Sequence, residues 1–330
     1  METIRIPSEK INIPVSRICL GTWAIGGWMW GGTDEEESIK TIHHAFDLGI
    51  NMIDTAPVYG FGKSEEIVGK AMQQYGKRDH IILATKVGLE WKDGKVFRNS
   101  SRERILKEID DSLTRLKTNY IDLYQVHWPD PNVPIEETAE VLLSLLKQGK
   151  IRAIGVSNYS PQEMEKFLKI TPIHTSQPPF NLFEREIEKN ILPFTEHHGI
   201  ITLAYGSLCR GLLTGKFKSN TQFTGDDLRK MDPKFQAPYF QEYLHDVKEL
   251  DEFSRENYQK NILALAVRWV LDKGKIIALW GARHPNQLQN IEEAMGWKLD
   301  GSAMSEIDRI LARNIKNPIG PEFMAPPSSL

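Results

Sequence analysis

Residues 101–127 read Ser-Arg-Glu-Arg-Ile-Leu-Lys-Glu-Ile-Asp-Asp-Ser-Leu-Thr-Arg-Leu-Lys-Thr-Asn-Tyr-Ile-Asp-Leu-Tyr-Gln-Val-His, and they join two patterns of secondary structure. Residues 101–117 predict a helix, because one face of it collects the apolar side chains Ile105, Ile109, Leu113 and Leu116. Ser100 and Glu103 have the spacing of a capping box at its start. Residues 121–127 form a short, largely apolar run that predicts a buried strand.

The same alternation of strand and helix patterns continues in both directions along the chain. Eight short apolar runs predict strands, at residues 18–21, 50–54, 81–86, 121–127, 153–157, 173–177, 200–205 and 276–281. Strands that alternate with helices form a parallel sheet. No G-x-G-x-x-G follows the first run, as an open nucleotide-binding sheet requires, and no linker interrupts the alternation. We therefore expect an α/β protein with one domain over residues 1–330, a single (β/α)8 TIM barrel.

Two segments depart from this rhythm. Residues 216–260 form a long polar insertion after the seventh strand, with one extra helix expected around Tyr243, Val247 and Leu250. Residues 314–330 carry four prolines and predict an irregular C-terminal tail. Loops of this length commonly act as lids or binding segments.

Composition and charge are those of an ordinary globular protein. Hydrophobic residues make up 40% and charged residues 26%, and the formal net charge is −3. This balance gives no global case for nucleic acid or an acidic membrane as partner, and the sequence does not indicate an oligomer. The two cysteines, Cys19 and Cys209, form no C-x-x-C pair, and His197-His198 have no clear carboxylate or thiol partner. We predict no metal site, no disulfide framework, no secretion signal and a cytoplasmic location.

Polar residues follow three neighbouring predicted strands. Asp54, Lys86 and His127 stand at strand ends, and Tyr59 lies five residues after Asp54. In a βα barrel the active site lies at this end of the strands. A lysine ammonium beside a tyrosine favours the phenolate and lowers the tyrosine pKa, and an aspartate holds the ammonium in place. Such a tyrosine can protonate a carbonyl oxygen while a histidine hydrogen-bonds the same oxygen.

The segments around these residues resemble the aldo-keto reductase superfamily, and the resemblance extends from Gly21 to beyond Arg283. It is carried by residues 51–60 (NMIDTAPVYG), 62–65 (GKSE), 84–86 (ATK), 121–129 (IDLYQVHWP) and 149–158 (GKIRAIGVSN). It implies an NADP(H)-dependent enzyme that reduces an aldehyde or ketone reversibly by hydride transfer. By resemblance, the catalytic tetrad is Asp54, Tyr59, Lys86 and His127, with Tyr59 as general acid and base.

The resemblance also implies how the cofactor is held. Ser157, Asn158 and Gln177 match residues that bind the nicotinamide carboxamide, and Tyr205 matches the aromatic residue that stacks on the ring. The remaining cofactor positions are Gly21, Thr22, Trp23, Asp54, Gly206, Ser207, Leu208, Cys209, Arg210, Gly211, Lys216, Gly281, Arg283, Gln287, Gln289 and Asn290. The substrate, a small carbonyl or alcohol, is expected against Trp23, Tyr59, Trp91, His127 and Trp128.

Three departures from the family pattern affect the cofactor prediction. The usual S-P-L-A-R-G reads Gly-Ser-Leu-Cys-Arg-Gly at residues 206–211, so the loop lacks its proline. Trp280 stands where many relatives have proline, and after Gln287 the usual asparagine spacing is shifted, which leaves both Gln289 and Asn290 as candidates. Arg283 is the predicted partner of the cofactor 2′-phosphate, because a guanidinium binds phosphate through two hydrogen bonds.

Two other functions are compatible with the same residues. One is an NADP-binding regulatory or sensor subunit with little turnover. The other is a barrel isomerase or aldolase in which Lys86 forms a Schiff base. Turnover that depends on Tyr59 distinguishes the enzyme from the first, and borohydride trapping tests the second.

Overall fold

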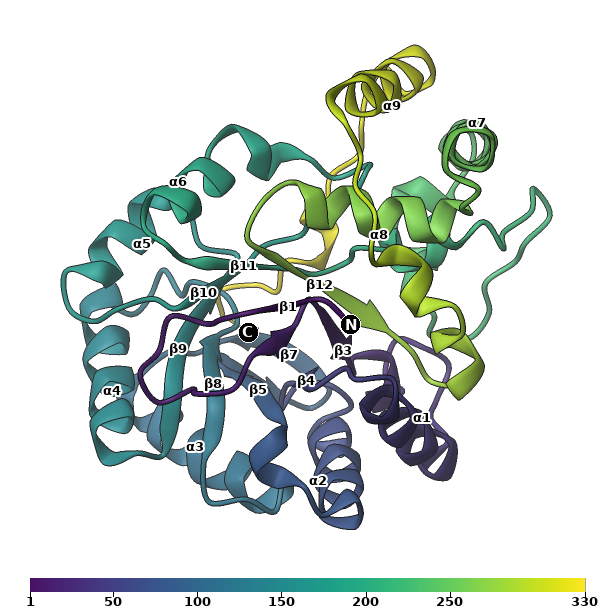
Figure 1. Cartoon of the computed structure of the whole chain (residues 1–330). Helices are drawn as coiled ribbons and strands as arrows, with labels where there is room; N and C mark the ends of the chain where they lie inside the picture. Colours follow the sequence, from purple (N-terminus) through teal and green to yellow (C-terminus); the bar gives the residue numbers. More distant parts are fainter. Residues whose placement is uncertain (330) are drawn as a thin grey trace.

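The computed structural model describes residues 1–329 and shows eight parallel strands closed into a barrel (Figure 1). The predicted (β/α)8 fold is confirmed, and each predicted run matches its strand to within two residues. In order around the barrel the strands are β3 (Ile18–Gly21), β4 (Met52–Asp54), β5 (Ile82–Val87), β8 (Ile121–Val126), β9 (Ile151–Ser157), β10 (Thr175–Gln177), β11 (Ile201–Ala204) and β12 (Ile276–Gly281). Because β12 pairs with β3, the barrel has no free edge.

Helices surround the barrel (Figure 1), and their buried apolar residues belong to the same hydrophobic cluster as those of the strands. They are α1 (Glu35–Asp47), α2 (Lys63–Tyr75), α3 (Arg102–Arg115), α4 (Ile135–Gln148), α5 (Pro161–Leu168), α6 (Ile191–His197), α7 (Tyr239–Tyr258), α8 (Ile262–Asp272) and α9 (Gly301–Asn314). Within residues 1–329, no helix is both long and apolar enough to cross a membrane.

Local side-chain hydrogen bonds set where two of these helices begin. Ser160 and Glu163 form a complete capping box at the start of α5. The cap of α3 is Ser101, whose hydroxyl accepts from the backbone N–H of Arg104. The predicted cap, Ser100, is wrong by one residue, because its N–H donates instead to the carboxylate of Asp130.

A hairpin that the sequence analysis did not predict closes the N-terminal end of the barrel. Strands β1 (Thr3–Ile4) and β2 (Val15–Ser16) pair antiparallel, and the chain between them crosses the barrel axis in Figure 1. Ile6, Ile11 and Val15 join the buried cluster formed by the side chains inside the barrel. The hairpin therefore closes the N-terminal end of the barrel. The opposite end, where the strands finish, is the one that can hold a binding site.

Three further segments lie at the carboxyl end of the barrel. Strands β6 (Leu89–Lys92) and β7 (Lys95–Arg98) form a hairpin between β5 and α3. The insertion after β11 contains α7, which confirms the extra helix, and its segment before α7 packs edge-to-face rings of Phe217, Phe223 and Phe235. The tail continues from α9 and contains a short 3₁₀ helix at Glu322–Met324.

Helices α7 and α9 lie beside each other at the periphery (Figure 1) and enclose a carboxyl group. Asp246 is fully buried on α7. One of its oxygens accepts a hydrogen bond from Nδ2 of Asn314 at 2.6 Å, and the other has no partner. Burial, with a contribution from the nearby Glu249 carboxylate, raises the pKa of Asp246 to about 7.

We expect Asp246→Asn to stabilise the protein at about pH 8 by on the order of 2 kcal/mol and to have less than half of that effect at about pH 5. The carboxyl binds its proton more tightly in the folded state, where its pKa is about 7, than in the unfolded state, where it is near 3.8. The wild type therefore loses stability as pH rises between those two values. Thermal unfolding at both pH values measures the change.

The control is Glu252→Gln, because Glu252 is an exposed carboxylate on the same helix. It should change the unfolding temperature little at either pH. A gain for Asp246→Asn that is the same at both pH values would contradict the assigned titration.

Candidate active site

The four residues of the predicted tetrad meet at the carboxyl end of the barrel. Asp54 ends β4, Lys86 lies near the end of β5, and His127 follows β8. Nζ of Lys86 contacts the Asp54 carboxylate and lies 3.2 Å from Oη of Tyr59. The rings of Tyr59 and His127 have centroids 5.7 Å apart and are nearly perpendicular. Parallel strands of one barrel finish at one end, so residues far apart in sequence converge here.

The Asp54 carboxylate is held from two more strands. Its second oxygen accepts hydrogen bonds from Nε2 of Gln125 and Nε2 of Gln177, each at 2.9 Å. Nζ of Lys86 also donates to the carbonyl oxygen of Thr55 at 3.0 Å. Every charged group of this buried pair is thus hydrogen-bonded, as burial requires. Gln125 is a part of the site that the sequence analysis missed, although its position two residues before His127 places it on the same strand.

Burial sets the protonation of Tyr59. It raises the pKa of Tyr59, and although the Lys86 ammonium lowers that pKa, the net shift is upward. The sequence-based expectation of a lowered pKa is therefore wrong for this structure, because it weighed the lysine and not the loss of water. Tyr59 holds its proton at neutral pH.

Lys86 and His127 carry opposite protonation states. Burial lowers the pKa of Lys86, but Asp54 and Tyr59 raise it more, so the amine stays charged. Burial and the neighbouring Lys86 charge hold the pKa of His127 well below its usual range. His127 is therefore neutral at neutral pH and has one ring N–H to donate.

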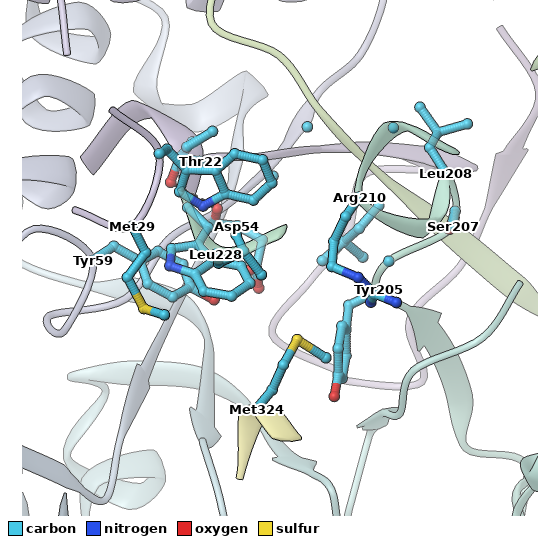
Figure 2. Close-up of a pocket in the computed structure, with 18 of the residues that line it drawn as sticks. Thr22, Met29, Asp54, Tyr59, Tyr205, Ser207, Leu208, Arg210, Leu228 and Met324 are labelled. Atoms are coloured by element: carbon cyan, nitrogen blue, oxygen red, sulfur yellow. Dashed lines mark hydrogen bonds between the residues drawn. The ribbon is translucent and has the colours of Figure 1, made fainter. Parts of the chain in front are cut away.

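The tetrad opens into a cavity of about 550 Å³ at the carboxyl end of the barrel (Figure 2). Lys86 lies beneath the cavity, since it is fully buried under Tyr59. The predicted cofactor and substrate residues that line the cavity are Gly21, Thr22, Trp23, Asp54, Tyr59, His127, Trp128, Ser157, Asn158, Gln177, Tyr205, Gly206, Ser207, Leu208, Arg210, Gly211, Lys216, Gly281, Arg283 and Gln287.

The structure does not bring four other candidates to the cavity wall. Trp91 turns toward Phe61, with ring centroids 5.7 Å apart, and away from the lining. The Cys209 thiol is completely buried, and burial raises its pKa to about 12. Gln289 and Asn290 lie beyond Gln287 and outside the lining residues.

Asn158 connects the tetrad to Tyr205. Its backbone is left-handed, with φ of 61°, which is rare for a residue other than glycine. From this position Nδ2 donates to the carbonyl oxygen of His127, and Oδ1 accepts from the Tyr205 hydroxyl, both at 3.0 Å. The ring of Tyr205 is thereby fixed at the cavity wall, and backbone strain at a ligand site is a common sign of function.

The loop after β11 presents its backbone to the cavity. Gly206, Cys209, Arg210 and Gly211 all have positive φ. The Arg210 side chain points away to a buried cluster, where it pairs with Glu184 at 2.5 Å and Asp232 at 2.6 Å. Its guanidinium is therefore already paired, and the prediction that residues 206–211 contact the cofactor rests on the backbone of this loop. The loop itself presents backbone groups to the cavity.

Arg283, Arg229 and Lys216 also line the cavity. Arg283 donates to the carbonyl oxygens of Trp30, at 2.6 Å, and Gly32, at 3.3 Å. Arg229, which the sequence analysis missed, pairs with Asp227 and lies over the Trp30 ring. Lys216 is exposed at the rim. Arg283 and Arg229 together form a positive region next to the loop after β3.

The insertion reaches across the cavity mouth to this same loop. The carboxylate of Asp226 accepts from the backbone N–H groups of Met29, at 2.8 Å, and Gly31, at 2.9 Å. The N–H of Leu228 donates to the carbonyl oxygen of Met29 at 3.0 Å. The segment therefore bridges the opening, in agreement with the general expectation for long loops in such barrels.

The region around Tyr59 is apolar and aromatic. Trp23 lies parallel to Tyr59 with ring centroids 6.0 Å apart. Trp28, Leu89, Val96 and Trp128 complete an apolar group with Tyr59. The tail residues Phe323, Met324 and Pro326 also line the cavity and were missed, because the tail has no periodic pattern that would indicate a wall.

The sequence matches the family described as Aldo/keto reductase family over residues 17–312, and the chain belongs to this family. It is an oxidoreductase of the class that reduces carbonyl groups with NAD(P)H. It is 60% identical to the aldo-keto reductase YhdN of Bacillus subtilis (strain 168), over 96% of each chain. It is 35% identical to the NADH-specific methylglyoxal reductase of Escherichia coli (strain K12), over 94% of this chain and 99% of that protein.

Solved structures agree with this assignment. A glycerol dehydrogenase from Gluconobacter oxydans has a TM-score of 0.89 and 54% identity, and the match covers 98% of this chain and 99% of that one. The aldo-keto reductase of Bacillus halodurans in its holo form has a TM-score of 0.77 and 27% identity, covering 94% and 96%.

Proposed function

We propose that this chain acts as a single barrel domain that interconverts an aldehyde or ketone and its alcohol, with NADP(H) as cofactor and Tyr59 as general acid and base. The observation that carries the proposal is the position of the Tyr59 hydroxyl. It lies 3.2 Å from Nζ of a lysine whose charge is fixed by Asp54, and it faces the cavity beside His127.

The proton chemistry follows from the three protonation states. Tyr59 holds its proton at neutral pH and can donate it to the carbonyl oxygen in the direction of reduction. Lys86 keeps its charge and stabilises the phenolate that remains. His127 is neutral and can donate its ring N–H to the same oxygen, which orients the carbonyl.

The cavity fits an extended dinucleotide with the residues present. Ser157, Asn158 and Gln177 can hold a carboxamide. Gln177 would use Oε1, because its Nε2 already donates a hydrogen bond to Asp54. Tyr205 offers a fixed ring for stacking. The cofactor supplies the hydride when bound. Backbone groups of residues 206–211, in the loop after β11, would hold the diphosphate.

Arg283 is our proposed partner for the 2′-phosphate, with Arg229 and Lys216 adding positive charge to the same region. Arg283 lies directly after β12, at the end of a barrel where phosphates commonly bind. Part of its guanidinium is occupied by the carbonyl oxygens of Trp30 and Gly32, so the contact would also fix that loop.

We expect Tyr59→Phe to lower kcat by at least about 100-fold, because the proton donor is removed. Lys86→Met should lower kcat by several orders of magnitude while NADPH affinity stays within a few fold. Oxidation of NADPH with simple aldehydes measures kcat, and quenching of protein fluorescence measures cofactor affinity.

The matched control is Tyr75→Phe, because the Tyr75 hydroxyl bonds to Asp47 on the outer helices, far from the cavity. It should leave kcat unchanged. Near-normal turnover in Tyr59→Phe would contradict the role of Tyr59 as proton donor. Tight NADPH binding without turnover of any carbonyl by the wild type would instead identify a regulatory subunit.

For Arg283→Ala we expect NADPH affinity to fall by about 10-fold or more, because a charge-assisted contact with the 2′-phosphate is lost. NADH affinity should change little, since NADH lacks that phosphate. Fluorescence titration with both cofactors gives the two dissociation constants. The NADH series also reports any loss caused by release of the Trp30–Gly32 loop, and equal losses for both cofactors would refute the phosphate contact.

A further inference from the structure

One motif of the sequence has no part in the chemistry proposed above. Residues 62–65 read Gly-Lys-Ser-Glu and lie at the start of α2, shortly after Tyr59. Ser64 and Glu65 are completely buried there. A hydroxyl and a carboxylate give up water only where other groups replace its hydrogen bonds, so the partners of these two side chains show what the motif holds in place.

The Ser64 hydroxyl lies in a buried chain of three hydroxyl groups. It accepts a hydrogen bond from Oγ1 of Thr55 at 3.0 Å and donates to Thr22, whose Oγ1 lies at 2.8 Å and whose carbonyl oxygen lies at 3.0 Å. Oγ1 of Thr22 in turn donates to the carbonyl oxygen of Asp54 at 2.9 Å. Each hydroxyl thus donates to the next residue of the chain. The chain joins the loop after β3 to Asp54 and Thr55, which both accept from the Lys86 ammonium.

Ser64 also contacts the backbone of the proton donor. Its N–H donates to the carbonyl oxygen of Tyr59 at 3.1 Å. From another side the loop after β3 packs against the same peptide group, because a Cβ on Gly26 would lie 2.6 Å from the carbonyl carbon of Tyr59. The φ of Gly26 is not positive, so this close approach, and not the backbone conformation, requires glycine. The Tyr59 backbone is therefore held between α2 and the loop after β3, on the side of the pocket where Figure 2 shows Thr22 and Tyr59.

Glu65 contacts the neighbouring strand. Its Oε1 accepts from Oγ1 of Thr85 at 2.6 Å, and its Oε2 pairs with Nε of Arg115 on α3 at 2.6 Å. Thr85 directly precedes Lys86 on β5. Successive side chains of a strand point to opposite faces, so Thr85 points outward to α2 while Lys86 points into the barrel. The start of α2 therefore also fixes the strand that carries Lys86.

We infer that Ser64 and Glu65 are positioning residues that set the distance between the Tyr59 hydroxyl and the Lys86 ammonium. Two adjacent residues of one helix start contact the segment of the proton donor and the strand of the ammonium, and this arrangement keeps Oη and Nζ 3.2 Å apart. A misplacement of about 1 Å can lower the rate of a catalysed step by about 100-fold. The inference rests on the proposed function, since it takes Tyr59 as the general acid.

Two substitutions each remove one hydroxyl and leave the shape of the side chain nearly unchanged. Ser64→Ala interrupts the hydroxyl chain, and Thr85→Val removes the contact with Glu65. With 4-nitrobenzaldehyde we expect kcat to fall by at least about 10-fold in Ser64→Ala and at least about threefold in Thr85→Val, because the Tyr59 hydroxyl leaves its place beside Lys86. NADPH affinity, measured by fluorescence titration, should stay within about threefold in both variants.

A double-mutant cycle with Tyr59→Phe separates positioning from a general loss of structure. If Ser64 and Thr85 act through the Tyr59 hydroxyl, their substitution has nothing left to displace once that hydroxyl is gone. We therefore expect each to change the residual turnover of Tyr59→Phe, followed at high enzyme concentration, by less than about twofold. Losses as large in Tyr59→Phe as in the wild type would overturn the inference, and so would a kcat within about twofold of the wild type in both single variants. Near-normal turnover in Tyr59→Phe itself would instead refute the proposed function, and the inference would fall with it.

The matched controls are Ser38→Ala and Thr41→Val on α1. Both hydroxyls are buried, but each donates only to a carbonyl oxygen four residues earlier, that of Asp34 at 2.6 Å and that of Glu37 at 2.7 Å. Each control loses a buried hydrogen bond, as its counterpart does, at a place that contacts neither Tyr59 nor Lys86. Neither control should change kcat by more than about twofold.

Discussion

The buried ion pair between Asp54 and Lys86 constrains both the fold and the site. Two charges without water are tolerated only when they are paired and when their remaining hydrogen-bonding positions are filled. Gln125 and Gln177 donate hydrogen bonds to the Asp54 carboxylate. The Lys86 ammonium donates to the Thr55 carbonyl oxygen and to the Tyr59 hydroxyl. These groups come from β4, β5, β8 and β10 and from the loop after β4, and only a closed barrel brings those strand ends to one point. The site is thus a consequence of how the barrel accommodates one charge pair.

The protonation states follow from the same burial. Loss of water favours the neutral forms of Tyr59 and His127, and the ammonium of Lys86 survives because Asp54 outweighs that loss. An acid that keeps its proton until a carbonyl arrives, beside a fixed positive charge, suits reduction better than a preformed phenolate would. The charge needed to stabilise the phenolate is already in place before the proton leaves, so little has to reorganise at that step.

The barrel and the positions of Asp54, Lys86 and His127 were predictable, because parallel strands are short apolar runs and their ends meet at one face. The β1–β2 hairpin was not, since its strands have two residues each and no period to detect. The pairing of Arg210 with Glu184 was hidden by the 26 positions between them. The direction of the Tyr59 pKa shift depends on a balance of burial against one lysine, and the sequence gives the partners without the burial.

The segments outside the barrel strands contact one another in two places around the cavity. The insertion reaches the loop after β3 through the Asp226 carboxylate, whereas the β6–β7 hairpin and the tail meet through Arg98. Neither set of contacts includes a residue of the tetrad. Because the tail lies outside the strands that carry Asp54 and Lys86, changes in the tail leave the buried charge pair in place. The barrel strands thus hold the buried charge pair, and the insertion, the hairpin and the tail contribute the outer lining of the cavity above it.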